Sequence, residues 1–503
     1  MSKYLLGIDN GVTVSKAALF TTDGEEVAVA SHKTKMLTPQ PGYTERDPDE
    51  LWQATAEAVG RVIQEAGVDP NDVACVACAG HGNGLYLIDE QGTSVRQGIL
   101  SMDNRAKDYI TRWHRDGVDK KVLPKTMQCL WPAQPNALLA WVRDNEPEVL
   151  KKARWAMMCK DLIRFRLTGE IYAELTDYSG TSLMDVGAGE FDGEVLEAFG
   201  IADMRDLLPP VKRSEEICGK ITAEAAAKTG LAEGTPVAGG LFDIDACGLA
   251  CNITDPTHLC MISGTWGNNQ YIWKESVVSQ DVFMTSRYCI PGYYLILEGS
   301  ATSASNLEWF VTQFFDAERN AADAMGESVY DLCNELVAGV KPDESKIVFL
   351  PFLFASNVDA EAKASFIGIQ GWHTRGHVLR AIYEGIVFGH KTHVNKLLKF
   401  RDMPGEIHLT GGAARSREWV QIFADVFQVP VHIPAGTELG ALGAAICAAV
   451  AAGIHPSYED ACKAMVKIAR VQDPNPTNKE VYDAKFERYQ KVIAALAPVW
   501  EDV

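Results

Sequence analysis

Short apolar runs separated by polar turns recur along the chain and predict a mixture of strands and helices. Residues 4–8 and 17–20 predict two strands joined by a polar turn. Apolar positions with helical period predict a helix from about residue 47 through 66, and residues 73–79 then predict a buried strand. Strand and helix signals that alternate in this way are typical of an α/β fold.

The pattern at the N-terminus recurs in the second half of the chain. Residues 258–262 again predict an apolar strand, and small and polar residues follow it at 263–268. A repeat that occurs once per half is too long for a solenoid and indicates a duplicated domain. We therefore expect domains at 1–247 and 248–503, with two related phosphate-binding turns on opposite sides of one cleft.

The first of these turns carries residue types suited to a nucleotide phosphate. The strand ends in Asp9, and Gly11, Thr13 and Lys16 follow. Turn N–H groups and hydroxyls can grip phosphate oxygens, Lys16 can add positive charge, and Asp9 can hold a hydrated Mg²⁺. An ordinary β-hairpin with a polar turn explains the same residues equally well.

The stretch at 236–250, PVAGGLFDIDACGLA, places a carboxylate after a sharp turn. A short apolar run ends at Gly239 and Gly240, and Asp243 then begins a segment of small residues that predicts a helix. A carboxylate at this position can act as a general base on a bound hydroxyl. The alternative is that Asp243 only caps the following helix.

Three further turns have a functional and a purely structural interpretation. The turn at 80–84 could present His81 and Asn83 to a polar ligand, or it could be a plain glycine-rich hairpin. Asp103 stands at a strand end and suits polyol recognition. The local sequence by itself favours the alternative, an ion pair between Asp103 and Arg105 on the surface. Gly411 begins a turn between a strand and a helix, and its bare backbone permits a flat ring to lie against it. The local sequence by itself favours a tight turn without a ligand.

Composition restricts the class of protein. A chain of 503 residues is too long for one hydrophobic core, and its 47% apolar and 23% charged residues are ordinary for a globular protein. A net charge of −20 argues against binding of nucleic acid or anionic membranes. The longest weakly polar run, 439–454, is too short to span a bilayer, and its Ala and Gly residues predict a tightly packed internal helix. Cysteines within apolar runs and an N-terminus without a signal-peptide pattern predict a cytoplasmic protein.

In combination, the ordered motifs resemble the FGGY carbohydrate kinases. The resemblance runs from about residue 4 to 450 and rests on PQPGYTERDP, MDNR, GGLFD, SGT, AIYEGI and TGGAARS. It implies two ribonuclease H-like domains of the actin/hexokinase/Hsp70 superfamily around an interdomain cleft. Within the family, PQPGYTERD, LSMDNR and GGLFD are most similar to the L-xylulose kinase group. The implied activity is ATP-dependent phosphorylation of a hydroxyl on a ketopentose or related polyol.

The resemblance also assigns roles to residues of this chain. Asp243 would be the catalytic base, and Asp9 would lie near Mg²⁺. His81, Asn83 and Asp103 would hold the sugar together with Asp243. The residues that would bind ATP are Gly11, Thr13, Lys16, Gly264, Thr265, Gly411, Gly412, Ala413 and Ser416. The family further suggests a homodimer.

The sequence departs from the family pattern at several positions. Val12 replaces the usual Thr or Ser of the first turn, Ile244 replaces the usual Asn after the base, and GSATSASN stands where relatives carry a Gly-Gly pair. Other family substrates therefore stay open, namely D-xylulose, ribulose, erythritol, glycerol or gluconate. A nucleotide switch like actin or Hsp70 is the alternative from another class. A P-loop kinase is disfavoured because no G-x-x-x-x-G-K-[ST] motif occurs.

Overall fold

The chain divides into two units in the computed structural model, which describes residues 3–354, 356, 358–359 and 361–502. The first unit comprises Met1–Thr254, Ile272–Ile296 and Gly436–Val466. The second comprises Asp255–Tyr271, Leu297–Ala435 and Lys467–Val503. Two segments that follow residue 248 thus pack with the first unit, which the sequence did not indicate. The division at 247 and 248 stays a prediction about the two duplicated domains.

The first unit is built on a mixed sheet with the order β13-β14-β5-β1-β2-β3, to which β15 adds by pairing with β5. The strands of this unit are β1 Tyr4–Asn10, β2 Val14–Thr21, β3 Glu26–Lys33, β4 Glu45–Arg46, β5 Val73–Gly80, β6 Tyr86–Ile88, β7 Gly98–Ile99, β8 Trp155–Met157, β9 Ala173–Glu174, β10 Met184–Asp185, β11 Glu190–Phe191, β12 Val211–Lys212, β13 Ile217–Lys220, β14 Pro236–Ala238, β15 Leu241–Phe242 and β18 Met284–Arg287. Its helices are α1 Pro48–Ala66, α2 Lys107–Arg115, α3 Val118–Thr126, α4 Pro135–Asn145, α5 Pro147–Leu150, α6 Cys159–Thr168, α7 Leu175–Tyr178, α8 Gly193–Ala198, α9 Ala223–Thr229, α10 Asp243–Ala250, α16 Leu439–Ala451 and α17 Tyr458–Met465.

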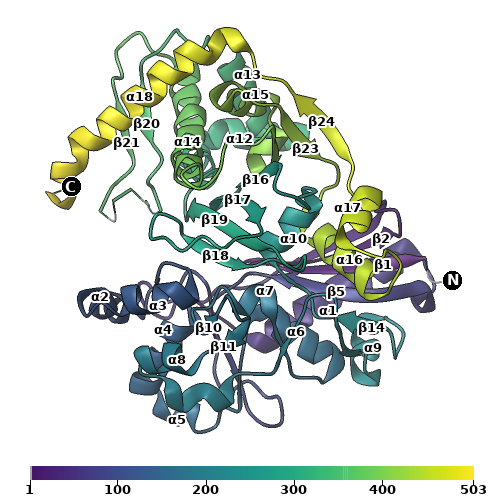
Figure 1. The fold of residues 1–503 in the computed structure, drawn as a ribbon. Helices are drawn as coiled ribbons and strands as arrows, with labels where there is room; N and C mark the ends of the chain where they lie inside the picture. The colour runs from purple at the N-terminus through teal and green to yellow at the C-terminus, as the bar shows by residue number, and fades with distance from the viewer. Residues whose placement is uncertain (1–2, 355, 357, 360, 503) are drawn as a thin grey trace. The chain divides into compact units, whose positions relative to one another are not determined.

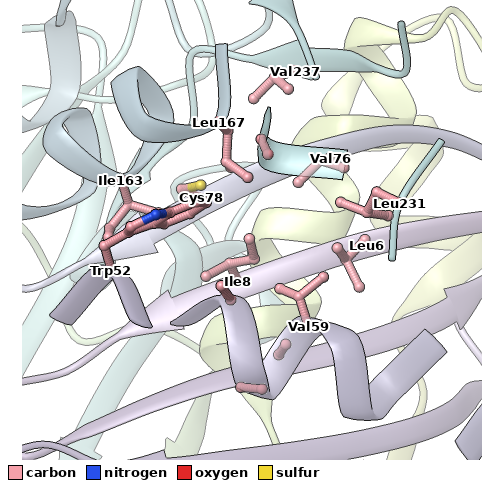
Figure 2. Close-up of a cluster of buried hydrophobic side chains, with 14 of the residues drawn as sticks. Leu6, Ile8, Trp52, Val59, Val76, Cys78, Ile163, Leu167, Leu231 and Val237 are labelled. Carbon is pink, nitrogen blue, oxygen red and sulfur yellow. The ribbon is translucent and has the colours of Figure 1, made fainter. Parts of the chain in front are cut away.

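One face of this sheet packs on α1 and α6. Leu6 and Ile8 of β1 are fully buried in a cluster with Val59 of α1 and Ile163 of α6. Figure 2 shows these apolar side chains from strands and helices directed toward one another. Because successive strand residues point to opposite faces, the intervening Gly7 and the following Asp9 face the other side of the sheet.

The other face of the sheet is covered by α16, whose small residues permit unusually close approach. A Cβ atom at Gly7 would lie 1.9 Å from the carbonyl oxygen of Ala441, and one at Gly443 would lie 2.0 Å from that of Ala246 in α10. The expectation of a tightly packed internal helix in this part of the sequence is thus confirmed. As a consequence, the beginning of α16 lies against the side of β1 that carries Asp9.

The second unit is built on a sheet in which β19, β17, β16, β22, β23 and β24 follow one another. Its elements, with two strands that begin or end beyond its limits, are β16 His258–Ser263, β17 Gly267–Trp273, β19 Tyr294–Ser300, β20 Val348–Leu350, β21 Ser365–Ile367, β22 Glu406–Thr410, β23 Val431–Pro434, β24 Ile468–Gln472, α11 Ser305–Phe314, α12 Asp316–Met325, α13 Val329–Ala338, α14 Arg375–Leu397, α15 Arg417–Phe427 and α18 Lys479–Leu496. In this unit α14 packs against α13, α15 and β20 (Figure 1).

The cores of the two sheets have the same connectivity. In the first unit β1 pairs antiparallel with β2 and parallel with β5. In the second, β16 pairs antiparallel with β17 and parallel with β22. The repeated strand–turn–strand pattern of the sequence therefore corresponds to a repeated structural unit, and the predicted α/β class is confirmed. Among the described residues, no helix has the length and apolar character needed to cross a membrane.

Candidate functional site

Several of the predicted residues of the first unit lie at one edge of its sheet. The strands β1, β5 and β15 are parallel neighbours, with Asn10 opposite Gly80 and Phe242 also opposite Gly80. Parallel strands bring their carboxyl ends to the same edge, where ligands commonly bind in open α/β sheets. The residues that end or follow these strands, Asp9, His81 and Asp243, are therefore brought to one edge.

Asp9 lies within a group of charged residues that faces α16. It stands directly opposite Lys16 on β2, and the Nζ atom of Lys16 lies 2.6 Å from Oε2 of Glu438. A Cβ atom at Gly440 would lie 2.3 Å from Oδ2 of Asp9, so α16 approaches the carboxylate with bare backbone. Burial raises the pKa of Asp9, although Lys16 opposes the shift. Glu438 had no signal in the sequence because only the packing of α16 brings it to Lys16.

The remainder of the first turn is open. Thr13 is exposed, and Gly11 is half-buried and donates its N–H to the carbonyl oxygen of Val14 at 3.0 Å. The guanidinium of buried Arg46 donates through Nη2 to the carbonyl oxygen of Gly11 at 2.9 Å. Arg46, which the sequence reasoning did not single out, therefore supports the turn from beneath.

Asp243 begins α10 and is half-buried. The N-cap of this helix is Phe242, and no side chain forms a capping hydrogen bond there, so the interpretation of Asp243 as a cap is wrong. Burial raises the pKa of Asp243 well above its ordinary value, and the negative charges of Asp9 and Asp177 raise it further. The carboxyl group thus holds its proton at higher pH than a solvated Asp, which is typical of a general base in an active site.

The turn that carries His81 and Asn83 packs against the residue before Asp243. A Cβ atom at Gly82 would lie 2.2 Å from the ring of Phe242. The ring of His81 is buried, with Nε2 at 3.3 Å from the hydroxyl of Tyr86. Burial and the charge of Arg46 lower the pKa of His81 to about 3, so the ring is neutral. The alternative of a plain glycine-rich hairpin, in which His81 would be solvated, is therefore wrong for this side chain, because its ring packs beside Tyr86.

Asn83 adopts a left-handed conformation with φ 60°, which brings the chain around sharply. Its side chain is buried, and its Oδ1 atom makes no hydrogen bond within the protein. A buried acceptor without a partner is costly unless a ligand or water satisfies it. Asn83 thus fits the polar contact that the sequence suggested, on the turn that packs against Phe242.

Asp103 is engaged within the protein. Its Oδ1 atom accepts from the Nε atom of Arg105 at 2.8 Å, and its Oδ2 atom accepts from the backbone N–H of Thr44 at 2.6 Å. Arg105 also lies 2.8 Å from Glu45, with its guanidinium 4.3 Å from the ring centre of Tyr43. The Asp–Arg pair is present as expected, but it is buried rather than on the surface. It joins the PQPGYTERDP and MDNR motifs.

A cluster of buried charges lies in the same unit and was missed from the sequence. The Nζ atom of Lys160 lies 3.1 Å from Asp161, 3.3 Å from Glu174 and 3.4 Å from Asp177, and all four side chains are fully buried. Burial alone would lower the pKa of Lys160, but these carboxylates raise it. Burial also raises the pKa of Asp177 to about 8. The available signal was a lysine and an acidic residue side by side near the start of this helix, α6.

In the second unit, the two predicted nucleotide turns lie against each other. Gly411 has φ 91°, and a Cβ atom there would lie 2.4 Å from the carbonyl oxygen of Ser263. A residue other than glycine would therefore separate the turn after β22 from the turn after β16. A Cβ atom at Gly264 would lie no closer than 4.0 Å to its nearest neighbour, the carbonyl oxygen of Trp266, and Thr265 is exposed.

A cavity of about 610 Å³ opens beside these turns, a volume typical of small-molecule sites. It is lined by Gly264, Thr265, Gly412 and Ser416, four of the predicted residues, together with Tyr383 and Trp419 among others. The rings of Tyr383 and Trp419 stack with centroids 4.4 Å apart. Ser416 caps α15 by accepting from the N–H of Trp419 at 3.1 Å. Ala413 is fully buried and does not line the cavity.

A buried polar chain supports the turn after β16. The hydroxyl of Ser263 lies 3.0 Å from that of Ser303, which in turn lies 2.9 Å from Nε2 of His390. The other ring nitrogen of His390 lies 2.8 Å from Oδ1 of Asn269. Burial lowers the pKa of His390 to about 3, so this ring is neutral. Ser303 belongs to the GSATSASN segment, which departs from the family pattern and here provides hydroxyl groups.

Comparison with known proteins identifies the family. The model of the N-terminal domain of the FGGY family of carbohydrate kinases matches residues 4–250, and that of its C-terminal domain matches 259–452. The chain is 37% identical to L-xylulose/3-keto-L-gulonate kinase of Escherichia coli, over 99% of this chain and 98% of the relative. It is 35% identical to a protein of Pasteurella multocida named "Probable L-xylulose kinase", over 98% of this chain and 99% of the relative.

A solved structure supports the same assignment. The crystal structure of xylulose kinase from Rhodospirillum rubrum matches with a TM-score of 0.88 and 27% identity, over 99% of this chain and 100% of that one. Family models and relatives thus agree along nearly the whole sequence. The protein belongs to the FGGY family of carbohydrate kinases.

Proposed function

We propose that this ATP-dependent carbohydrate kinase phosphorylates a hydroxyl of L-xylulose or a closely related ketose, with Asp243 as the base. The full-length similarity to the L-xylulose/3-keto-L-gulonate kinase of E. coli, at 37% identity, carries the choice of sugar. The half-buried carboxylate at the start of α10, with its raised pKa, supports the choice of base.

In the proposed step, Asp243 accepts the proton of the sugar hydroxyl while the oxygen of that hydroxyl attacks the γ-phosphorus of ATP. The bond between the γ-phosphorus and the bridging oxygen breaks, and ADP leaves with the electron pair. Phosphoryl transfer depends chiefly on positioning and on charge stabilisation. We assign the sugar to His81 and Asn83 on the turn beside Asp243, where the unpaired Oδ1 of Asn83 can accept from a sugar hydroxyl. Asp103 orients this region through Arg105.

Mg²⁺ is part of the proposal, and the residues at Asp9 fit it. The charge of Asp9 raises the pKa of Asp243, and that of Glu438 raises the pKa of Asp9, which Lys16 in turn lowers. Such an excess of carboxylates favours a hard divalent cation. Asp9 would hold the ion through water, and Mg²⁺ when bound would neutralise charge on the phosphates.

We assign ATP to two sets of residues. Gly11, Thr13 and Lys16 provide backbone N–H groups, a hydroxyl and a positive charge for phosphate oxygens, as the sequence suggested. In the second unit, the cavity beside Gly264, Thr265, Gly412 and Ser416 has the volume for a nucleoside. Gly411 supports this cavity by keeping the two turns in contact, and Ala413 packs beneath it.

Replacement of Gly440 by Ala tests the proposed role of Asp9. The added Cβ would lie 2.3 Å from the Asp9 carboxylate, which must then move. We expect kcat to fall by about tenfold to a hundredfold, since small displacements in an active site have effects of this size. Stability should change little, because the gain in helix propensity of about 1 kcal/mol offsets part of the strain. Gly193→Ala, where no atom lies within 4 Å, is the matched control. Equal kcat values for the two variants would contradict the role of Asp9.

The choice of sugar is tested by ADP release over a panel of sugars and polyols. L-xylulose, 3-keto-L-gulonate, D-xylulose, L-ribulose, D-ribulose, erythritol, glycerol and gluconate are compared at equal concentrations with Mg·ATP. We expect the highest kcat/KM for L-xylulose or 3-keto-L-gulonate, and at least about tenfold less for D-xylulose, the equivalent of 1.4 kcal/mol in transition-state binding. A preference for glycerol or erythritol would overturn the choice of sugar and leave the kinase activity intact.

The remaining parts of the proposal concern the state of the protein in the cell. We infer a cytoplasmic homodimer, on the resemblance to the family and on the composition of the sequence. Light scattering coupled to size-exclusion chromatography distinguishes a dimer from the 55.0 kDa monomer.

A further inference from the structure

We propose that His258, Glu406 and His408 form a binding site for a transition-metal ion of the Zn²⁺ class, separate from the kinase site. These residues come from β16 and β22 of the second unit. One ligand atom from each, two imidazole nitrogens and a carboxylate oxygen, lies within 4.8 Å of the others. No role in sugar or ATP binding has been assigned to any of them.

The register of the sheet explains why these side chains meet. His258 stands opposite Glu406 in the parallel pair of β16 and β22, and His408 stands opposite His432 in the pair of β22 and β23. Residues two apart in a strand point to the same face, so all four side chains project from one face of three adjacent strands. No local motif in the sequence reveals this group, because its members are up to 174 positions apart in the chain, from 258 to 432.

The atoms are arranged around one carboxylate. Oε1 of Glu406 lies 2.7 Å from Nε2 of His258 and 3.0 Å from Nε2 of His408. In a tetrahedral zinc site with metal–ligand distances of about 2.0–2.2 Å, ligand atoms are separated by roughly 3.3–3.5 Å. These two separations would therefore have to grow by roughly 0.3–0.8 Å to admit the ion. Imidazole with carboxylate is a ligand set that suits Zn²⁺ and Ni²⁺.

Outer contacts orient the proposed ligands. Nδ1 of His258 lies 3.5 Å from Asp255, so a carboxylate lies behind the nitrogen that does not face the site. Oε2 of Glu406 lies 3.2 Å from Nε2 of His432, which leaves Oε1 directed at the other two histidines. Carboxylate–histidine–metal arrangements of this kind are usual in metal sites, because they fix the tautomer and orientation of the ring.

The three proposed ligands differ in exposure, and a simpler role is also open to them. His408 is only 2% exposed, whereas His258 and Glu406 are half-buried. The simpler alternative is that Glu406 only accepts hydrogen bonds from the N–H groups of the surrounding imidazole rings and that no metal binds. Titration with a metal distinguishes the two.

A metal bound at this site would stabilise the sheet of the second unit. His258 is the first residue of β16, and the turn of Gly264 follows the last. At about 3.3 Å per residue, the metal would lie roughly 15–20 Å from the nucleotide turn. It would link β16 to β22, the two strands that end in the nucleotide turns, and so stabilise the second unit without touching the substrates.

The test uses the full chain without an affinity tag, freed of metal with a chelator and kept free of Mg²⁺ and ATP. Co²⁺ is titrated while visible absorption is recorded, because tetrahedral Co²⁺ absorbs strongly, and Zn²⁺ is then added in competition. We expect one Co²⁺ per chain, displaced by Zn²⁺, and a rise in the thermal midpoint with Zn²⁺. His258→Gln and Glu406→Gln should each weaken binding by about a hundredfold or more, beyond the loss from outer contacts alone.

The matched control is His32→Gln. His32 forms an exposed pair with Glu57 at 3.0 Å in the first unit, with the same residue types but outside the proposed ligand group. This variant should bind Co²⁺ as the parent does. The thermal midpoint of each metal-free variant shows that it is folded. Absence of stoichiometric Co²⁺ binding to the parent, or equal affinity in His258→Gln and His32→Gln, would overturn the proposal.

Discussion

Replacement of Asp243 by Asn is expected to lower kcat by about 10²–10⁴-fold and to leave ATP binding nearly unchanged. Asn has nearly the same shape but cannot accept the proton of the sugar hydroxyl. The side chain is half-buried at the first residue of α10, and its carboxylate accepts a hydrogen bond from the backbone N–H of Ile244, which the amide oxygen of Asn can also accept. The loss should therefore fall on kcat rather than on the KM for ATP.

The pH profile provides a second readout for the same variant. Burial and the charges of Asp9 and Asp177 raise the pKa of Asp243, and the base acts only after it loses its proton. In the parent enzyme kcat/KM should therefore rise with pH through this raised pKa and then level off. Asp243→Asn should lack this limb. Exposed Asp203 provides the control, and Asp203→Asn should behave as the parent. A kcat within threefold of the parent in Asp243→Asn would exclude Asp243 as the base.

Replacement of Lys160 by Met is expected to cost about 3–5 kcal/mol of stability, because it leaves buried carboxylates without their cation. Lys160 is fully buried and lies within 3.4 Å of Asp161, Glu174 and Asp177. The guanidinium of Arg164, with Nη1 2.6 Å from Oδ1 of Asp161, is the positive charge that remains in this group. Met preserves most of the apolar volume, so the loss should report on charge rather than on a cavity.

The measurement is the thermal midpoint at neutral pH, which should fall by about 5–8 °C for a loss of this size in the first unit. Lys151→Met is the control, because Lys151 forms an ion pair with Glu148 at 2.7 Å in which both side chains are at least 70% exposed. Pairs of that kind contribute about 0–1 kcal/mol. If the two variants melt within about 1 °C of each other, the buried cluster does not stabilise the fold as described.

The fold class and most elements were accessible from the sequence because they depend on local patterns. The helix expected from about 47 to 66 is α1, Pro48–Ala66, with Asp47 as its cap, and the strand expected at 73–79 is β5, Val73–Gly80. Asp47 accepts hydrogen bonds from the N–H groups of Asp49 and Glu50, the usual contacts of an N-cap. Alternation, caps and glycines act over a few residues, so the sequence reveals them directly.

The environment of the candidate site was less accessible. The sequence singled out Asp9, His81 and Asp243 separately, and the pairing of β1, β5 and β15 brings them to one edge. It did not reveal that His81 is buried and neutral, nor that Arg46 lies beneath the first turn. Burial and charge at these positions arise from residues that are distant in the chain, and no local pattern reports them.

By itself, the sequence determined the repeated strand–turn–strand unit, the small-residue helix and the carboxylate of Asp243, because apolar periodicity and glycine placement act locally. Only the tertiary structure decided that α16 packs its glycines onto β1 beside Asp9. It also decided that Lys160 lies among three carboxylates and that histidines from separate strands surround Glu406. These arrangements depend on strand register and helix packing, which a pattern along one chain does not specify.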